Sequence, residues 1–589
     1  MPARERMSPV DTAWLRMDRP SNLMMIVGVM VLPGPVDASR LRATVERRLV
    51  QRFRRFRQKT VSDWTGWWWQ DDPEFDLDRH LVWRALPEPA GQRELQRLVS
   101  DLATEPLHPG RPLWRYDIID HCNGGAAIVS RIHHCIADGI ALVGVMLSLT
   151  DLDPDAPAEE PLEADERPAH RPAHDLHADP WSALLDPLTQ ATTAALGMGG
   201  RFWQEYLKIT SQPERLLGYG KHGMGFATEL GKLLVMPADS PTRYKGRTGS
   251  HKRVAWCDPI PLDEVKAVAK ALGCSVNDLL LNAVAGALRS YLEAQGDPLN
   301  DVELRALVPV NLRGGQPSDD LGNRFGLVTL LLPLHEGNPF KRLKLVRQRM
   351  LDMRGSYQPP LTMLLLGLSG LVPKFMQDQL LDVLANKASA VMTNVPGPQQ
   401  PLYLAGQRID QIMFWVPQSG DIGIGVSILS YNQTVQFGLI ADRRFIPDPE
   451  TVTPLFQAEF EKIVTGTLLH HWVEPLDAQA FEEAIEVELG KRPRKAPVVE
   501  VAEPPASAMP AKKAARKSAV QASGTPPGES PARRTVKPVT KPLPKPASKT
   551  AVAKNVASAK PASAARLPPK PAEPPEQAQV RIPKRFRGL

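Results

Sequence analysis

The last 99 residues of the chain limit its possible folds more than any other feature. From Lys491 to Leu589 the sequence holds 19 prolines, repeated Lys-Pro pairs as in KPVTKPLPKPASK, and almost no large apolar side chains. Such a composition cannot bury enough surface to offset the entropy lost on ordering the chain. We therefore expect residues 491–589 to be a disordered tail, locally extended like polyproline, and the fold to lie within the first 490 residues.

The same tail carries the positive charge of the protein. It contains 22 Lys and Arg against 5 Asp and Glu, a net charge of +17, and since the whole chain carries +7, the preceding 490 residues carry −10. A basic segment of this kind is typical of binding to anionic lipid or to nucleic acid, and either interaction would weaken steeply with salt. A solvated spacer without a partner is the third possibility.

Two blocks of mixed helix and strand pattern flank a region of different composition. Residues 1–150 combine strand-like runs such as GAAIVSRIHH with helical ones such as RELQRLVSDLA, and residues 254–490 repeat the mixture with LDEVKAVAKAL and IGIGVSILSY. Residues 151–253 begin rich in Pro and acids and continue with helical spacing, which predicts an acidic linker and a helical connector. Two α/β blocks joined in this way suggest a cleft between them.

Cysteine usage and apolar runs restrict the cellular setting. The four cysteines (Cys122, Cys135, Cys257, Cys274) form no CxxC pair, which argues against a disulfide framework or structural zinc and fits a reducing cytosol. The charged start, MPARERMSPVDTAW, predicts no signal peptide. The longest apolar run, Leu361–Val372, has twelve residues where a membrane span needs ~20, so we expect a buried helix or else an interfacial one.

Two adjacent histidines, in RIHHCIADG, end a strand-like run. Because side chains alternate along a strand, Ile132 and His134 share one face while Arg131 and His133 share the other. The first face is the more apolar, so we expect His134 to point into an enclosed site and His133 into structure. Desolvation would keep the His134 imidazole neutral and able to act as a general base. Two structural histidines fit these residues equally well, whereas metal binding is disfavoured because no zinc spacing is present.

Asp138 and Gly139 follow the histidines and precede IALVGVMLSLT, a predicted helix. Gly139 permits a tight turn at the start of that helix, and Asp138 can cap it or pair with an arginine. A direct contact between Asp138 and His134 would favour the imidazolium. We therefore expect Asp138 to engage an arginine or the backbone and to organise the loop.

The pattern HHxxxDG, from His133 to Gly139, resembles the acyltransferase superfamily of chloramphenicol acetyltransferases and peptide-synthetase condensation domains. Further segments occur in the order expected of one branch, the bacterial wax ester synthase/acyl-CoA:diacylglycerol acyltransferase family. They are the N-terminal MSPVDTAWLRMDRP, FDLDRHLVWRALPEPAG, PLW, SVNDLLLNAVAGALRSYL, VPVNLR, LGNRFG and TNVPGP. The similarity covers about residues 7–475 and leaves out the tail.

This resemblance implies an α/β fold of two chloramphenicol-acetyltransferase-like domains that form a pseudo-dimer with an interface tunnel. It gives His134 the general-base role, assigns His133 and Asp138 to the architecture of the loop, and makes Gly139 the residue that leaves room for substrate.

The resemblance also supplies substrate-binding candidates from the second block, namely Asn277, Asp278, Asn311, Arg313 and Asn394. Asn277 would face the tunnel, although from the residues alone it fits better as a helix N-cap. Asn311 and Arg313 would brace the domain interface, with Arg313 as a candidate partner of Asp138. Asn394 falls in TNVPGP, a pattern that on its own predicts a Pro-Gly turn.

The activity implied is transfer of a long-chain acyl group from acyl-CoA to diacylglycerol, to a long-chain alcohol, or to both. Thiolate is a good leaving group and no GxSxG elbow is found, so no acyl-enzyme is expected, and no cofactor beyond acyl-CoA as co-substrate. Two alternatives stay open: an acyltransferase of the same superfamily with a polyketide or glycolipid acceptor, and a structural protein of lipid droplets or granules that uses the basic tail.

Because these acceptors dissolve in membranes, we expect a cytoplasmic protein bound peripherally to the inner membrane or to lipid droplets. Candidate contacts are Leu361–Val372 and the tryptophans of WTGWWWQ (Trp64, Trp67, Trp68 and Trp69), since Trp favours interfaces. An edge strand packed on the core would explain the tryptophans equally well.

Overall fold

The computed structural model describes residues 4–159, 231–312 and 321–469, apart from 233, 234, 354, 355, 357 and 386. The tail predicted over 491–589, Arg313 and most of the connector predicted over 151–253 lie outside the described residues. Contacts divide the chain into Met1–Pro497 and Val498–Leu589, and all described residues belong to the first unit.

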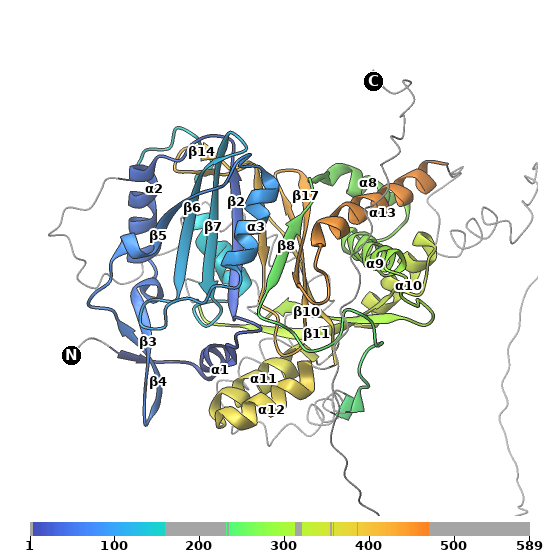
Figure 1. The fold of residues 1–589 in the computed structure, drawn as a ribbon, viewed down its shortest axis with the longest axis horizontal. Helices are drawn as coiled ribbons and strands as arrows, with labels where there is room; N and C mark the ends of the chain where they lie inside the picture. The colour runs from blue at the N-terminus through green and yellow to red at the C-terminus, as the bar shows by residue number, and fades with distance from the viewer. Residues whose placement is uncertain are drawn as a thin grey trace, which may run out of the picture. The chain divides into compact units, whose positions relative to one another are not determined.

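Two large β-sheets form the frame of this unit (Figure 1). The five-stranded sheet runs in the order β15 (Gln411–Trp415), β2 (Met25–Leu32), β7 (Gly125–His133), β6 (Trp114–Cys122), β5 (Leu81–Ala85). The seven-stranded sheet runs β11 (Phe325–Pro333), β10 (Glu303–Asn311), β12 (Ala390–Pro396), β16 (Ile424–Tyr431), β17 (Thr434–Asp442), β8 (Lys252–Trp256), with β9 (Ile260–Pro261) also paired to β17. Smaller sheets pair β1 (Arg4–Arg6), β4 (Gly66–Asp71) and β3 (Gln58–Asp63), and β13 (Tyr403–Leu404) with β14 (Gln407–Arg408).

Helices cover the sheets, and the described residues have the mixed α/β architecture that the sequence predicts (Figure 1). In the first block they are α1 (Pro9–Met17), α2 (Ala38–Val45) with the π-helical turn Glu46–Gln51, α3 (Gln92–Leu102), α4 (Gly139–Ser148), and the 3-10 turns Arg54–Arg57 and Leu77–Arg79. In the second block they are α8 (Leu262–Ala271), α9 (Val276–Ala294), α10 (Pro339–Asp352), α11 (Gln358–Leu371), α12 (Lys374–Ala385) and α13 (Pro449–Leu469). Among the described helices none alone is long and apolar enough to span a membrane, although α8 and α9, bent by 100°, pass that length and composition test as a pair.

A strand from the second block completes the sheet of the first. β15 pairs antiparallel with β2, from Gln411 opposite Val31 to Trp415 opposite Val27. Asn22 makes a second connection, since its side-chain nitrogen donates to the carbonyl of Gly420 at 2.6 Å. The two blocks of the sequence are therefore joined through a shared sheet and through buried polar contacts.

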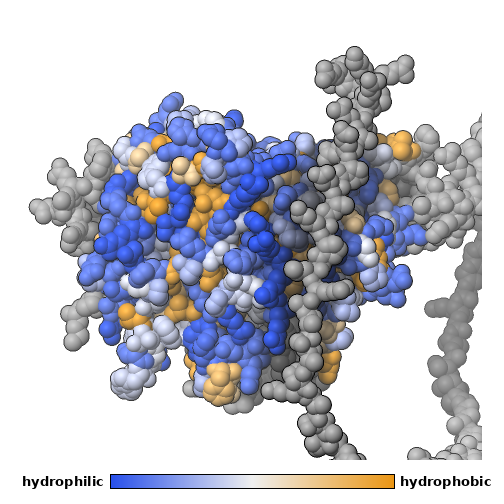
Figure 2. Space-filling view, viewed as in Figure 1, coloured by the Kyte–Doolittle hydropathy of each residue, from blue (hydrophilic) through white to orange (hydrophobic). Residues whose placement is uncertain are grey.

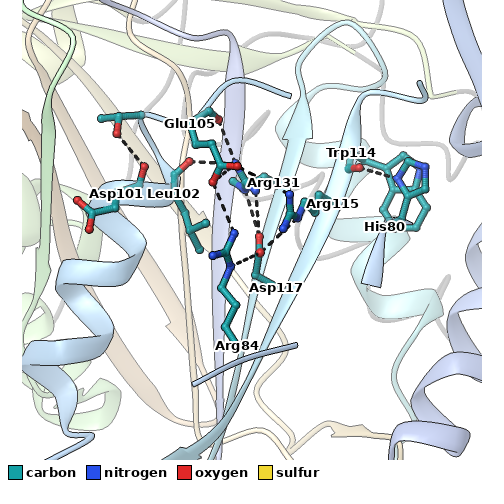
Figure 3. Close-up of polar contacts among 10 residues, drawn as sticks. His80, Arg84, Asp101, Leu102, Glu105, Trp114, Arg115, Asp117 and Arg131 are labelled. Carbon is teal, nitrogen blue, oxygen red and sulfur yellow. Dashed lines mark hydrogen bonds and ion pairs between the residues drawn. The ribbon is translucent and has the colours of Figure 1, made fainter. Parts of the chain in front are cut away.

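The face of β7 that carries Arg131 is closed by an ion-pair cluster (Figure 3). The buried carboxylate of Asp117 lies 3.1 Å from Arg131, 2.6 Å from Arg84 and 3.3 Å from Arg115. Arg131 also donates to the backbone carbonyl of Glu105 at 3.0 Å, just beyond the end of α3. This face of the sheet therefore fixes α3 in place and leaves the opposite face free to form a site.

Helix α11 contains the apolar run that begins at Leu361, up to Leu371. Close backbone contacts hold this helix against α1 and β11. A Cβ on Gly370 would lie 1.8 Å from the carbonyl oxygen of Pro9, and one on Gly326 would lie 2.0 Å from that of Pro359. Leu361 is buried, whereas Leu371 is 67% exposed. The helix is thus half-buried, between the two alternatives predicted for it.

The tryptophan run lies in β4, the central strand of the three-stranded sheet, and in the turn before it. Trp69 is fully buried, with the guanidinium of Arg55 4.7 Å from its ring centroid, whereas Trp64 in the turn is almost fully exposed. Packing on the core therefore accounts for Trp69, and Trp64 is the most solvent-accessible member of the run.

Candidate functional site

The two histidines at the end of β7 face different surroundings. His133 Nδ1 accepts the amide of Cys135 at 3.1 Å, which places the proton on Nε2, 3.4 Å from a carboxylate oxygen of Asp18. His134 lies one residue beyond the strand, where its amide donates to the carbonyl of Met24 at 2.7 Å, and its side chain lines a cavity. This is the placement that the alternation of side chains predicts.

Aromatic rings enclose the imidazole of His134. The ring of Trp14 stacks on it with centroids 4.1 Å apart, and the ring of Phe325 lies 5.4 Å away. Only 3% of His134 is exposed. This burial lowers the pKa of His134 to about 4, against the opposing effect of Asp138, so the imidazole is neutral at physiological pH.

Asn323 determines which nitrogen of His134 carries the proton. Its amide nitrogen donates to Asp11 at 2.8 Å and to the carbonyl of His134 at 2.9 Å. Both partners are acceptors, so the amide oxygen must be the atom 2.9 Å from His134 Nδ1. Nδ1 therefore donates, and Nε2 keeps its lone pair.

A buried acid holds this arrangement in turn. Asp11 on α1 is fully buried, and its second carboxylate oxygen lies 3.1 Å from Arg55. The ion pair with Arg55 offsets part of the cost of burying the carboxylate. The result is a chain of contacts from Arg55 through Asp11 and Asn323 to His134.

Asp138 organises the loop through backbone amides, one of the two modes predicted for it. One carboxylate oxygen accepts the amide of Ala141 at 2.9 Å and so caps α4, and the other accepts the amide of Arg324 at 2.9 Å. Because Arg324 follows Asn323 in the chain, Asp138 also fixes the segment that carries Asn323.

Gly139 faces open space. A Cβ added to it would meet no atom nearer than Val416 Cγ1 at 4.0 Å, so packing alone does not demand glycine here. Its position lines two cavities at once, which fits the prediction that this residue leaves room for substrate.

The His134 cavity has mostly apolar walls drawn from both blocks of the sequence. Asn311, Thr393, Asn394 and Ser419 supply its polar groups from the second block. Its apolar lining includes Trp14, Leu307, Pro309, Val310, Phe325, Leu327, Val391, Val395, Phe414 and Val416.

Three further cavities adjoin this one. The α4 cavity shares Gly139 and Phe414 with it. The α11 cavity shares Trp14 and Phe325 among other residues, and the α9 cavity shares Pro309, Val310 and Asn394. A continuous interface tunnel stays a prediction, but the shared walls place three apolar spaces next to the His134 cavity.

The structure corrects the N-cap interpretation of Asn277. Ser275 caps α9 and forms a capping box with Asp278, whose carboxylate accepts the Ser275 amide at 3.0 Å. This capping accounts for Asp278 without any contact to substrate. Asn277 instead accepts a hydrogen bond from Asn394 Nδ2 at 2.6 Å and lines the α9 cavity.

The structure also corrects the interpretation of Asn394 as part of a turn. It lies within β12, which pairs with β16 from Ala390 through to Pro396. The Pro-Gly pair lies at the end of that strand, so the turn signal applies to the last residues of TNVPGP only.

Sequence reasoning missed Asp11, Trp14 and Asn323 as members of the site. Asp11 and Trp14 are three residues apart, which puts them on one face of α1, and a carboxylate beside an indole on a buried face is a signal that could have been noticed. Asn323 stands inside LGNRFG, but the motif does not reveal a partner 189 residues away in the chain.

The chain matches two sequence models of one family. Residues 7–280 match the wax ester synthase/diacylglycerol acyltransferase catalytic domain, and residues 321–464 match the WS/DGAT C-terminal domain. Among curated relatives, a probable diacylglycerol O-acyltransferase of Mycobacterium tuberculosis (strain H37Rv) is 28% identical over 386 residues, covering 64% of this chain and 77% of the relative. A putative diacylglycerol O-acyltransferase of Mycobacterium tuberculosis (strain CDC 1551) is 26% identical over 492 residues, covering 78% and 90%.

Solved structures share the fold. The wax ester synthase/diacylglycerol acyltransferase from Marinobacter aquaeolei VT8 superposes with a TM-score of 0.54 at 22% identity, covering 79% of this chain and all of that one. A trichothecene 15-O-acetyltransferase from Fusarium sporotrichioides gives a TM-score of 0.51 at 12% identity, covering 78% and 95%.

Proposed function

Because this chain belongs to the wax ester synthase/diacylglycerol acyltransferase family and is an O-acyltransferase, we propose that it moves a long-chain acyl group from acyl-CoA to diacylglycerol, to a long-chain alcohol, or to both, with His134 as general base. One observation carries the proposal. A neutral imidazole, its Nδ1 held by Asn323, lines a cavity with mostly apolar walls.

The chemistry needs two proton transfers, to and from one imidazole, and the exchange of a carbon–sulfur bond for a carbon–oxygen bond. The acceptor hydroxyl oxygen attacks the thioester carbonyl carbon while His134 Nε2 takes the hydroxyl proton. The tetrahedral intermediate then collapses, the carbon–sulfur bond breaks, and the departing thiolate takes that proton to leave as CoA thiol. The ester forms without a covalent acyl-enzyme, and no step needs a metal or a redox cofactor.

The surroundings of His134 suit this task. The low pKa keeps Nε2 free of a proton, so no fraction of the enzyme is lost to the imidazolium at neutral pH. The apolar walls exclude water, which would otherwise compete with the alcohol and hydrolyse the thioester.

A polyketide or glycolipid hydroxyl is the alternative acceptor. Long-chain acceptors are favoured by the mostly apolar lining of all four adjoining cavities. A polyketide or a sugar would need many hydrogen-bonding partners, and the walls of the His134 cavity offer few.

Both proposed acceptors reside in lipid, so the protein must meet a lipid surface. Four large apolar side chains, Leu368, Leu371, Phe375 and Met376, are exposed where α11 turns into α12, and Figure 2 shows apolar surface there at the lower edge. Lys374 lies among them with its side chain 54% exposed and its ammonium 3.5 Å from the carboxylate of Asp378. Helix α11 also lines the α11 cavity, which reaches Trp14 and so adjoins His134. We assign this α11–α12 corner to a lipid surface rather than to a protein partner.

Vesicle flotation tests the assignment. Vesicles of phosphatidylcholine and phosphatidylglycerol should float the wild-type protein, and Leu371→Ser with Phe375→Ser should lower the bound fraction severalfold. Leu351→Ser, which removes an exposed leucine from α10, is the matched control and should bind like wild type. Equal binding by the double variant, or equal loss in the control, would contradict the assignment.

Two further proposals concern the whole protein. We propose a cytoplasmic location at the inner membrane or on lipid droplets, and binding of the basic tail to anionic lipid or nucleic acid. The charge of +17 over residues 491–589 supports both, because attraction to phosphates would bring the protein to either partner. Binding by full-length and tail-deleted protein (1–490) should differ at low salt and converge as salt rises.

A thiol-release assay with product analysis tests the function itself. Palmitoyl-CoA with hexadecanol or with dioleoylglycerol should yield free CoA and the matching ester. A structural lipid-droplet or granule protein would release no thiol with either acceptor. Activity restricted to hydroxylated polyketide or glycolipid acceptors would replace the acceptor while keeping the reaction.

A further inference from the structure

Strands β10 and β12 lie next to each other in the seven-stranded sheet but are joined over a short length only. Their register contains two pairs, Ala306 with Ala390 and Leu307 with Val391, although all residues of both strands are described. On their outer sides, β10 pairs with β11 at nine positions and β12 pairs with β16 at seven. Each strand is therefore held by its outer partner while the two separate after Leu307 and Val391.

Cavities lie on both faces of the sheet where the strands separate. Side chains alternate between faces, so Leu307 and Thr393 point to one side and Val308 and Pro396 to the other. Leu307 and Thr393 line the His134 cavity, whereas Val308 and Pro396 line the α9 cavity. The two cavities thus occupy opposite faces of one sheet.

Residues at the separation line both cavities. Pro309 and Val310 on β10, with Asn394 on β12, are shared between the two. Asn394 is fixed there by its hydrogen bond to Asn277, at the start of α9. Where the strands separate, the spaces on the two faces are therefore bounded by the same three residues.

We propose that the acyl chain of the donor thioester passes between β10 and β12 into the α9 cavity while its carbonyl group stays beside His134. This inference rests on the proposed acyl transfer and adds where the long chain lies. The α9 cavity has apolar walls suited to a hydrocarbon, formed by Leu262, Val276, Leu280, Val308, Val328, Met350, Met353, Ile428 and Val435.

The shape of the passage selects the donor over the acceptor. An opening between two strands admits one linear chain, whereas diacylglycerol carries two chains on one backbone. The two proposed acceptors differ in shape, but the donor always presents a single chain. A passage for the donor therefore serves both reactions, and Met350 and Met353 at the end of α10 would set the longest chain accommodated.

Substitutions that fill the α9 cavity test the proposal through chain-length preference. We would measure kcat/KM of the full-length protein for butyryl-, octanoyl-, dodecanoyl- and palmitoyl-CoA with hexadecanol as the fixed acceptor. Val308→Phe, beside the passage, should lower the palmitoyl-CoA value about tenfold or more relative to the butyryl-CoA value. Met353→Trp, at the far end, should affect palmitoyl-CoA and spare dodecanoyl-CoA.

Two variants provide comparison. Val61→Phe makes the same change on β3, far from the four cavities, and should keep the wild-type profile. Val143→Phe makes it in the α4 cavity, the rival location for the chain, and should leave the ratio of palmitoyl- to butyryl-CoA activity unchanged.

Several outcomes would overturn the proposal. A chain-length shift in Val143→Phe and none in Val308→Phe would place the chain in the α4 cavity. A change in preference among alcohols of different length, with an unchanged donor profile, would assign the α9 cavity to the acceptor. Wild-type protein inactive with every acyl-CoA would instead refute the proposed function, so the two failures are distinguishable.

Discussion

The two large sheets differ in how completely their inner strands pair. In the five-stranded sheet β2 and β7 pair at eight consecutive positions, from Met25 opposite His133 to Leu32 opposite Ala126, whereas β10 and β12 pair at two. The fully paired sheet ends at the histidines and holds them rigidly. The partly separated sheet offers space on both of its faces. One block thus fixes the reactive group, and the other accommodates substrate.

The two blocks do not divide these roles strictly, because the second block also supplies the residue that fixes the tautomer of His134. Asn323 reaches from the loop before β11 to His134, and Asp138 of the first block holds the neighbouring amide of Arg324. Each block therefore positions a residue of the other, and the reactive tautomer exists only where they meet.

The largest effect should follow from cutting this connection. Asn323→Ala removes the acceptor for His134 Nδ1, leaves Asp11 without its amide partner and frees the imidazole to adopt the wrong tautomer. We expect kcat for ester formation to fall on the order of 10²-fold. Thermal unfolding should still show a cooperative transition, and a kcat within twofold of wild type would show that tautomer control lies elsewhere.

The next effect concerns stability and the contact of α11 with the first block. Gly370→Ala forces a Cβ against the backbone of Pro9, so we expect the free energy of unfolding to fall by about 1–3 kcal/mol in urea denaturation. Gly367→Ala on the same helix is the control, because its Cβ would meet Val10 at an ordinary 3.7 Å. Equal stability of the two variants would mean that α11 shifts without cost.

The third prediction concerns the pH profile. His134 with a pKa of about 4 is an active base above that pH, so kcat/KM should decline only as the pH falls towards 4. Asn323→Asp, made together with Asp11→Asn so that two carboxylates do not meet, places a carboxylate against Nδ1, which favours the imidazolium and raises the pKa of His134. The acid limb should therefore move to higher pH. An unmoved limb, or one that moves to lower pH, would show that His134 is not the titrating group.

The sequence predicts local features of this site and misses those that join distant segments. The face of His134 follows from strand alternation, and the backbone contacts of Asp138 follow from its place before a helix. The bond from His134 to Asn323 spans 189 residues, and the pairing of β15 with β2 spans more than 370, so no local pattern encodes either. From the residues alone Asn277 fits an N-cap because Asn suits that position, but Ser275 two residues earlier suits it equally and has Asp278 at the capping-box spacing.

The separation of β10 from β12 is equally invisible in the sequence. Both sequences have the apolar pattern of ordinary buried strands. Pro309 within β10 is the one local sign that pairing on one edge is incomplete, since proline lacks the amide hydrogen needed for hydrogen bonds between strands. Whether two adjacent strands stay paired depends on what packs on both faces of the sheet, which becomes visible only in three dimensions.

The most direct test of the account is single-turnover thiol release from palmitoyl-CoA, with hexadecanol present, by His134→Ala protein. If Nε2 of this residue removes the hydroxyl proton, the rate of the chemical step should fall by about 10²–10⁴ while the fold and acyl-CoA binding are retained. A His134→Ala rate close to wild type, alongside a loss of activity in His133→Ala, would contradict the account and transfer the base to the other histidine.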